Sequence, residues 1–131
     1  MKRAGILNAD LSAHIARLGH TDRFLVVDSG FPIPPGVPVV DLRLIFGIPR
    51  FADVLSAVVA EVAVESAVVA TELADANPAT DSVISSTLDG VRAVPHDELK
   101  QLASSARFAV RSAEDTPYSN VLLTAGVAFD V

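Results

Sequence analysis

The chain alternates between two patterns of apolar positions, one that favours helices and one that favours buried strands. The clearest helical stripe lies near the start and consists of Leu7, Leu11, Ile15 and Leu18. Spacings of four, four and three place these side chains on one face, which predicts a helix over residues 8–18. Asn8 or Asp10 can cap its start, and Gly19 follows where helices commonly end.

Further along, short apolar runs alternate with segments of helical spacing. The helical segments predict helices over residues 51–60, 78–88 and 96–105. The apolar runs predict strands over residues 24–27, 37–44, 62–71, 91–94, 108–111 and 121–124. Residues 62–71 are ambiguous, because their Ala content permits a helix while their density of Val favours a strand. We therefore predict one α/β domain over residues 1–131, a three-layer α/β/α arrangement with a mostly parallel, mixed sheet.

The composition supports a globular domain and excludes several kinds of site. The chain has 131 residues, of which 50% are hydrophobic and 5% aromatic, enough apolar material for a core without cross-links. It contains no Cys, which excludes disulfides, thiolate metal sites and Cys nucleophiles. A mean hydropathy of +0.44 is high for a small monomer and points to an oligomer.

The charge and the lengths of the apolar segments narrow the classes of partner. The net charge is −6 without a basic stripe, so nucleic acid and anionic membrane surfaces are poor candidates. No run of about 18 apolar residues exists, and we expect no transmembrane helix. The basic start, residues 1–3, is not followed by the apolar segment of a signal peptide. We therefore expect a soluble cytoplasmic protein.

The common cofactor and metal motifs are missing from the sequence. There is no glycine-rich dinucleotide loop, no Walker loop and no serine nucleophile elbow. The three His residues do not stand at the spacings typical of zinc ligands. We therefore expect neither a bound cofactor nor a metal centre.

Two candidate functional residues flank the first predicted strand. His20 follows Gly19 at the end of the first helix, where the helix dipole favours the imidazolium form. A His that reaches both protonation states near neutral pH suits general acid–base catalysis, although its position alone favours a cap that bonds the last helix carbonyls. Asp28 closes the strand, where ligands gather in α/β sheets. The alternative for Asp28 is a turn residue that bonds its own backbone.

Two further pairs of candidates lie later in the chain. His96 and Lys100 stand four residues apart at the start of a helix, so they share a face. They belong either to a site or to a solvated helix start. Tyr118 and Asn120 lie in a polar segment between two strands, and their side chains both donate and accept hydrogen bonds. This suits a ligand rich in hydroxyl groups, and a polar surface loop is the alternative.

Several stretches of the chain, taken together, match one family. They are residues 5–8, 18–22, 28–34, 47–51 and 117–120, together with His96, Lys100 and Arg111. In this order they resemble the D-ribose pyranase family, a branch of the ribose pyranase and fucose mutarotase superfamily. The fucose branch has Gly-His-Gly-Asp where this chain has Gly-His-Thr-Asp, so Thr21 favours the ribose branch. The Pro-Ile-Pro sequence at residues 32–34 favours it as well.

The resemblance implies a role for each matched residue. His20 corresponds to the proton donor of the family. The residues that correspond to its sugar-binding groups are Asp28, His96, Lys100, Tyr118 and Asn120. The resemblance further implies D-ribose as substrate, no cofactor, a cytoplasmic location and a homo-oligomer, typically a decamer of two stacked pentameric rings.

The expected reaction is compatible with the absence of cofactor motifs. Exchanging the pyranose and furanose rings of a sugar needs one acid and one base for ring opening, and no hydride or electron transfer. Two alternatives stay open at this point. One is a fucose-type mutarotase that exchanges α and β anomers, and the other is a sugar-binding protein without turnover.

Overall fold

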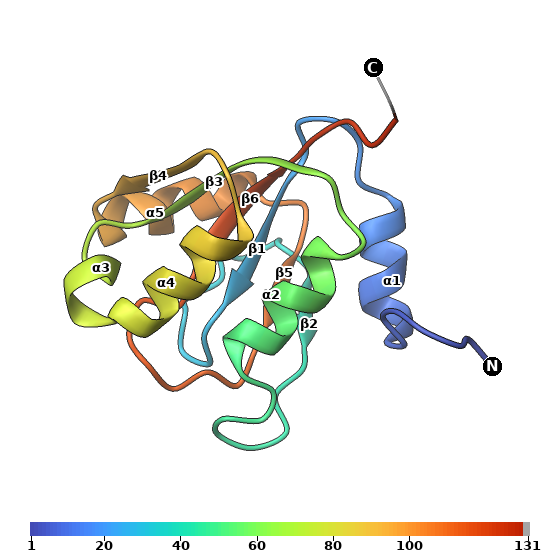
Figure 1. Ribbon diagram of the computed structural model, residues 1–131, viewed down its shortest axis with the longest axis horizontal. Coiled ribbons are helices and arrows are strands. Elements are labelled where there is room, and N and C mark those ends of the chain that lie inside the picture. The colour runs from blue at the N-terminus through green and yellow to red at the C-terminus, as the bar shows by residue number, and fades with distance from the viewer. Residues whose placement is uncertain (130–131) are drawn as a thin grey trace.

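The computed structural model describes residues 1–129, and within them six strands form one sheet (Figure 1). Their order is β2 (Val39–Asp41), β5 (Ala109–Arg111), β1 (Arg23–Val27), β6 (Val121–Ala125), β3 (Val64–Ala70) and β4 (Val91–Val94). β6 runs antiparallel to its neighbours β1 and β3, whereas the other neighbouring strands pair in parallel. The mostly parallel, mixed sheet predicted from the sequence is confirmed.

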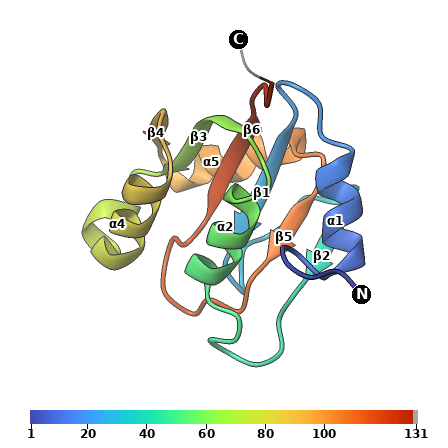
Figure 2. The same ribbon diagram turned by 45° about the vertical axis from the view of Figure 1, so that its right-hand side comes forward.

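Helices cover both faces of this sheet, which gives the three predicted layers (Figures 1 and 2). One face carries α1 (Ala9–Ala16), α2 (Phe51–Val59), α3 (Leu73–Ala76) and α4 (Pro78–Thr87). The other face carries α5 (His96–Leu102) and the 3₁₀ turn η1 (Ala103–Ser105). Among residues 1–129, no helix combines the length and the apolar character that crossing a bilayer requires.

Strand β1 shows how the sequence divides the core into two halves. Phe24 and Val26 pack into the cluster under α2, and Leu25 and Val27 pack into the cluster under α5. Successive side chains of a strand point to opposite faces, so a continuous apolar run is buried on both sides. All four side chains are fully buried. Asp28, the next residue, lies at the carboxyl end of this central strand. The edge of the sheet formed there by the strand ends is flanked by helices on both sides.

The first helix differs from its prediction at both ends. The side chain of Asn8 accepts a hydrogen bond from the backbone N–H of Leu11 at 2.9 Å, and the helix begins at Ala9. Leu7 therefore precedes the helix and is exposed, so its assignment to the buried stripe is wrong. The left-handed residue after the helix is Thr21, with φ 72°, and Gly19 does not take that conformation.

Two other elements also differ from the sequence-based prediction. The strand predicted over residues 37–44 is limited to Val39–Asp41, because its one neighbour, β5, offers only three residues for pairing. Helix α3 was not predicted, since a segment of four residues is too short to show a periodic pattern. The remaining helices and strands lie where the apolar pattern placed them, to within a few residues.

Candidate functional site

Four of the predicted site residues line one pocket at an edge of the sheet. The pocket has a volume of about 230 Å³ and is lined by Asp28, Gly30, Phe31, Pro32, His96, Tyr118 and Asn120. These residues come from the loop after β1, the start of α5 and the turn before β6. The end of β1 and the start of β6 lie at the same edge because the two strands are antiparallel. Segments far apart in the sequence thus meet in one place.

Asp28 and Asn120 form the polar floor of this pocket. The amide nitrogen of Asn120 donates to Oδ2 of Asp28 at 3.1 Å, and the backbone N–H of Asp28 donates to Oδ1 of Asn120 at 2.9 Å. The backbone N–H of Gly30 donates to Oδ1 of Asp28 at 3.0 Å. Burial raises the pKa of Asp28 above its usual value, although these hydrogen bonds oppose the shift. The result is a carboxyl group with a fixed orientation at the pocket surface.

His96 is held between two aromatic rings and a carboxylate. Its ring meets Tyr118 edge-to-face with centroids 5.1 Å apart, and Phe31 in the same manner at 6.0 Å. The carboxylate of Glu72 accepts the backbone N–H of His96 at 3.0 Å, at the start of α5. Nδ1 of His96 is buried and has no hydrogen-bond partner within residues 1–129. The aromatic contacts and the bond to Glu72 together fix the imidazole ring in the pocket wall.

Tyr118 contributes an aromatic wall in an unusual backbone conformation. Its φ is 58°, in the left-handed region that bulky residues rarely adopt. Strained backbone of this kind persists only where the surrounding structure enforces it, and it gathers at functional sites. The side chain packs against the apolar clusters on both faces of the sheet. Its conformation is therefore fixed by the fold and not by local preference.

Lys100 lies close to the pocket but is not one of its lining residues. It follows His96 by one helical turn, and its ammonium group forms an ion pair with Asp97 at 3.0 Å. The ion pair is on the surface and restrains Lys100 only weakly. The predicted role of Lys100 in sugar binding stays a prediction.

His20 stands at the opposite edge of the sheet from the pocket. It precedes β1, whereas Asp28 follows β1, so roughly 17 Å of strand separates them. Nε2 of His20 lies 2.8 Å from Oε2 of Glu65, near the start of β3, and the His20 side chain is 52% exposed. The turn that presents His20 places Thr21 in the left-handed conformation. Within one chain, His20 and the pocket are separate.

The sequence did not predict that two residues outside the pocket would hold its segments in place. Glu72 and Asn77 hold pocket segments through hydrogen bonds to backbone and side-chain groups. Asn77 stands directly before Pro78, which signals a helix start, but this pattern says nothing about contacts in the folded chain.

The sequence and the fold both have close counterparts among known proteins. A family model matches residues 1–128, almost the whole chain. The chain belongs to the RbsD / FucU transport protein family. The family resemblance inferred from the sequence is thereby confirmed.

Within the RbsD / FucU family, the chain is similar to proteins named D-ribose pyranase, to RbsD and to FucU. The protein named D-ribose pyranase 1 of Rubrobacter xylanophilus is 51% identical over 129 residues, which cover 98% of this chain and all of the relative. The structure of Bacillus subtilis RbsD complexed with D-ribose matches with a TM-score of 0.95 at 37% identity, over 98% of this chain and all of that one. FucU from Bifidobacterium longum matches with a TM-score of 0.77 at 20% identity, over 94% of this chain and 97% of that one, and so shares the fold.

Proposed function

We propose that this protein is a D-ribose pyranase, which interconverts the β-pyranose and β-furanose forms of D-ribose. The observation that carries the proposal is the pocket that joins Asp28, His96, Tyr118 and Asn120. It offers an oriented carboxyl group, an amide, a phenol and an imidazole ring, which together suit a small neutral ligand with many hydroxyl groups. The identity to relatives named D-ribose pyranase supports the choice of sugar.

The proposed reaction consists of proton transfers around ring opening and ring closure. A base removes the proton of the anomeric hydroxyl group while the bond between C1 and the ring oxygen breaks. The ring oxygen takes the electron pair and receives a proton, which leaves the open-chain aldehyde. The hydroxyl group on C4 then adds to C1 in the reverse sequence of transfers, and the furanose forms. One well-placed acid–base group contributes about 10² to 10⁴ in rate to such steps.

In this proposal His20 moves the protons and the pocket holds the sugar. Asp28 and Asn120 orient sugar hydroxyl groups, while His96 and Tyr118 bind the ring. Lys100, one helical turn beyond His96, is assigned an outer sugar contact with its ammonium group.

The distance between His20 and the pocket leads us to propose a shared site. Because the two lie at opposite edges of the sheet in one chain, His20 would reach the pocket of a neighbouring subunit. An apolar projection supports such assembly, since Leu44, Ile45, Phe46 and Ile48 are all exposed in the single chain. Phe46, the most exposed of the four, exposes 79% of its surface. We extend the proposal to a decamer of two stacked pentameric rings in the cytoplasm, as the family resemblance implies.

Saturation transfer between the anomeric protons of D-ribose tests the activity. The wild-type protein should transfer saturation from the β-pyranose to the β-furanose signal far faster than buffer does. The His20→Ala variant should lose about 10² to 10⁴ of this acceleration. Ribose exchange no faster than in buffer would overturn the proposal. L-Fucose in the same assay then tests the fucose-type alternative, and ribose binding without exchange would identify a sugar-binding protein.

A further inference from the structure

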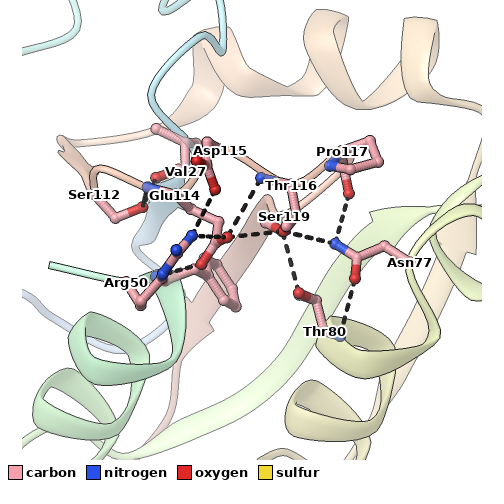
Figure 3. A network of polar contacts seen from close by, with 11 residues as sticks. Val27, Arg50, Asn77, Thr80, Ser112, Glu114, Asp115, Thr116, Pro117 and Ser119 are labelled. Atoms are coloured by element: carbon pink, nitrogen blue, oxygen red, sulfur yellow. Dashed lines mark hydrogen bonds and ion pairs between the residues drawn. The ribbon is translucent and has the colours of Figure 1, made fainter. Parts of the chain in front are cut away.

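A largely buried polar cluster joins the start of α4 to residues 116–120, which carry Tyr118 and Asn120 and which we call the pocket turn. Figure 3 shows the side chains of this cluster. We call Asn77, Thr80, Thr116 and Ser119 the Asn77 cluster. Asn77 stands at the junction of α3 and α4, where it is 7% exposed, and Ser119 is fully buried. The cluster therefore joins a helix layer to the pocket turn across 39 to 42 residues of sequence.

The oxygen and the nitrogen of the Asn77 side-chain amide contact two different parts of the chain. Its oxygen accepts the backbone N–H of Thr80 at 3.3 Å and so caps α4. Its amide nitrogen lies 3.0 Å from Oγ1 of Thr116, 2.9 Å from the carbonyl oxygen of Pro117 and 3.1 Å from Oγ of Ser119. Capping a helix requires only the oxygen. The amide nitrogen serves the pocket turn alone.

These contacts surround the strained residue of the pocket. Thr116 and Pro117 precede Tyr118 and Ser119 follows it, so Asn77 contacts the chain on both sides of the left-handed backbone. Thr80 adds a contact between its hydroxyl group and that of Ser119 at 3.2 Å. A strained conformation holds only when its neighbours are fixed. The Asn77 cluster supplies this fixation from outside the pocket.

Glu114 also holds the start of the same turn, through Thr116 of the cluster. The carboxylate of Glu114 accepts the hydroxyl group of Thr116 at 2.8 Å and the backbone N–H of Phe51 at 3.1 Å. Asn77, together with Thr80, binds the second half of the turn, next to Tyr118.

We propose that Asn77 is a positioning residue for sugar binding. By holding residues 116–119, it keeps the ring of Tyr118 against His96 and the amide of Asn120 against Asp28. This inference rests on the proposed function, because it assumes that the pocket binds D-ribose. Asn77 is not one of the residues that line the pocket, so its loss weakens sugar binding more than it slows proton transfer.

Asn77→Ala tests this proposal, with Asn8→Ala as a matched control. Asn8 caps α1 through a single hydrogen bond and has no contact with the pocket turn. In ribose exchange kinetics, we expect Asn77→Ala to raise KM on the order of tenfold while kcat changes by less than about threefold. Asn8→Ala should leave KM unchanged. An unchanged KM in Asn77→Ala, with kcat reduced in proportion to folded protein, would show a merely structural role and overturn the proposal.

A spectroscopic measurement tests the positioning without any need for turnover. The chain contains one Tyr and no Trp, so the near-ultraviolet circular dichroism of tyrosine reports on Tyr118 alone. We expect this band to shrink by about half or more in Asn77→Ala and to persist in Asn8→Ala, because an immobilised ring gives the stronger signal. A wild-type band in Asn77→Ala would overturn the proposal even if the protein catalysed no exchange.

Ser119→Ala provides a second test in case the Asn77→Ala variant does not fold. It removes one acceptor of Asn77 but leaves the cap of α4 and the backbone of the turn in place. We expect a rise in KM and a loss of the tyrosine band in the same direction, both smaller than in Asn77→Ala. A wild-type protein without ribose exchange would defeat the proposed function alone, whereas an active wild type with an unaffected Ser119→Ala variant would defeat this inference.

Discussion

Asp28 and Asn120 bind each other through two hydrogen bonds, although 92 residues separate them in the sequence. One bond joins the carboxylate to the amide nitrogen, and the other joins the amide oxygen to the backbone N–H of Asp28. The pair fastens the end of β1 to the start of β6. It also fixes the direction of a carboxyl group whose pKa burial raises. Pocket shape and pocket chemistry therefore depend on the same contact.

The raised pKa of Asp28 gives the first prediction, a pH-dependent stability difference. The folded protein holds the Asp28 proton more tightly than the unfolded chain, so ionised Asp28 lowers stability at neutral pH. Relative to Asp28→Asn, the free energy of unfolding of the wild type should fall as pH rises from 3.8 through the raised folded value, and then level off. Urea unfolding of both proteins between about pH 4 and about pH 7 measures this difference. A difference that does not vary with pH would contradict it.

The second prediction concerns the shared site. His20→Ala and Asp28→Ala should each be nearly inactive, since each lacks one half of every site. When the two variants are expressed together, about a quarter of neighbouring pairs combine an intact pocket with an intact His20. Ribose exchange should then recover to about a quarter of the wild-type rate. If mixed assemblies form without recovery, His20 and Asp28 do not act across subunits.

The third prediction concerns Thr21, whose φ of 72° is unfavourable for a β-branched residue. Thr21→Gly removes this strain but adds freedom to the unfolded chain, and we expect a net gain of up to about 1 kcal/mol in the free energy of unfolding. Gly90→Ala provides the opposite case. There, φ is 65° and a Cβ atom would lie 2.9 Å from the carbonyl oxygen of Glu65, so stability should fall. Thermal or urea unfolding should show a higher stability for Thr21→Gly and a lower stability for Gly90→Ala than for the wild type.

The fourth prediction concerns the apolar projection at residues 44–48. Its backbone is held in place, because the N–H of Gly47 donates to the carbonyl oxygen of Ala113 at 2.7 Å. Phe46→Ser should therefore leave the fold intact while weakening assembly, which sedimentation would show as smaller species. Ribose exchange should fall together with assembly. Gln101→Ser, at an exposed polar position of α5, should change neither quantity.

Local patterns were sufficient for most secondary structure and for proposing four of the pocket residues as candidates. The apolar run before Asp28 predicted β1, and Asn8 and Pro78 marked the starts of α1 and α4 correctly. These predictions succeeded because capping, proline geometry and side-chain alternation act over a few residues. The assignment of Leu7 to the buried stripe was wrong, because a cap at Asn8 excludes the preceding residue from the helix.

The sequence alone determined the class of fold, the family and the set of candidate polar groups. Only the tertiary structure decided which of those groups meet. The antiparallel insertion of β6 beside β1 brings Asn120 to Asp28, and strand β1 itself keeps His20 at the other edge. The same folding places Asn77 behind the turn of Tyr118. Such long-range pairings depend on strand order and on burial of the whole core, and no local pattern of residues contains them.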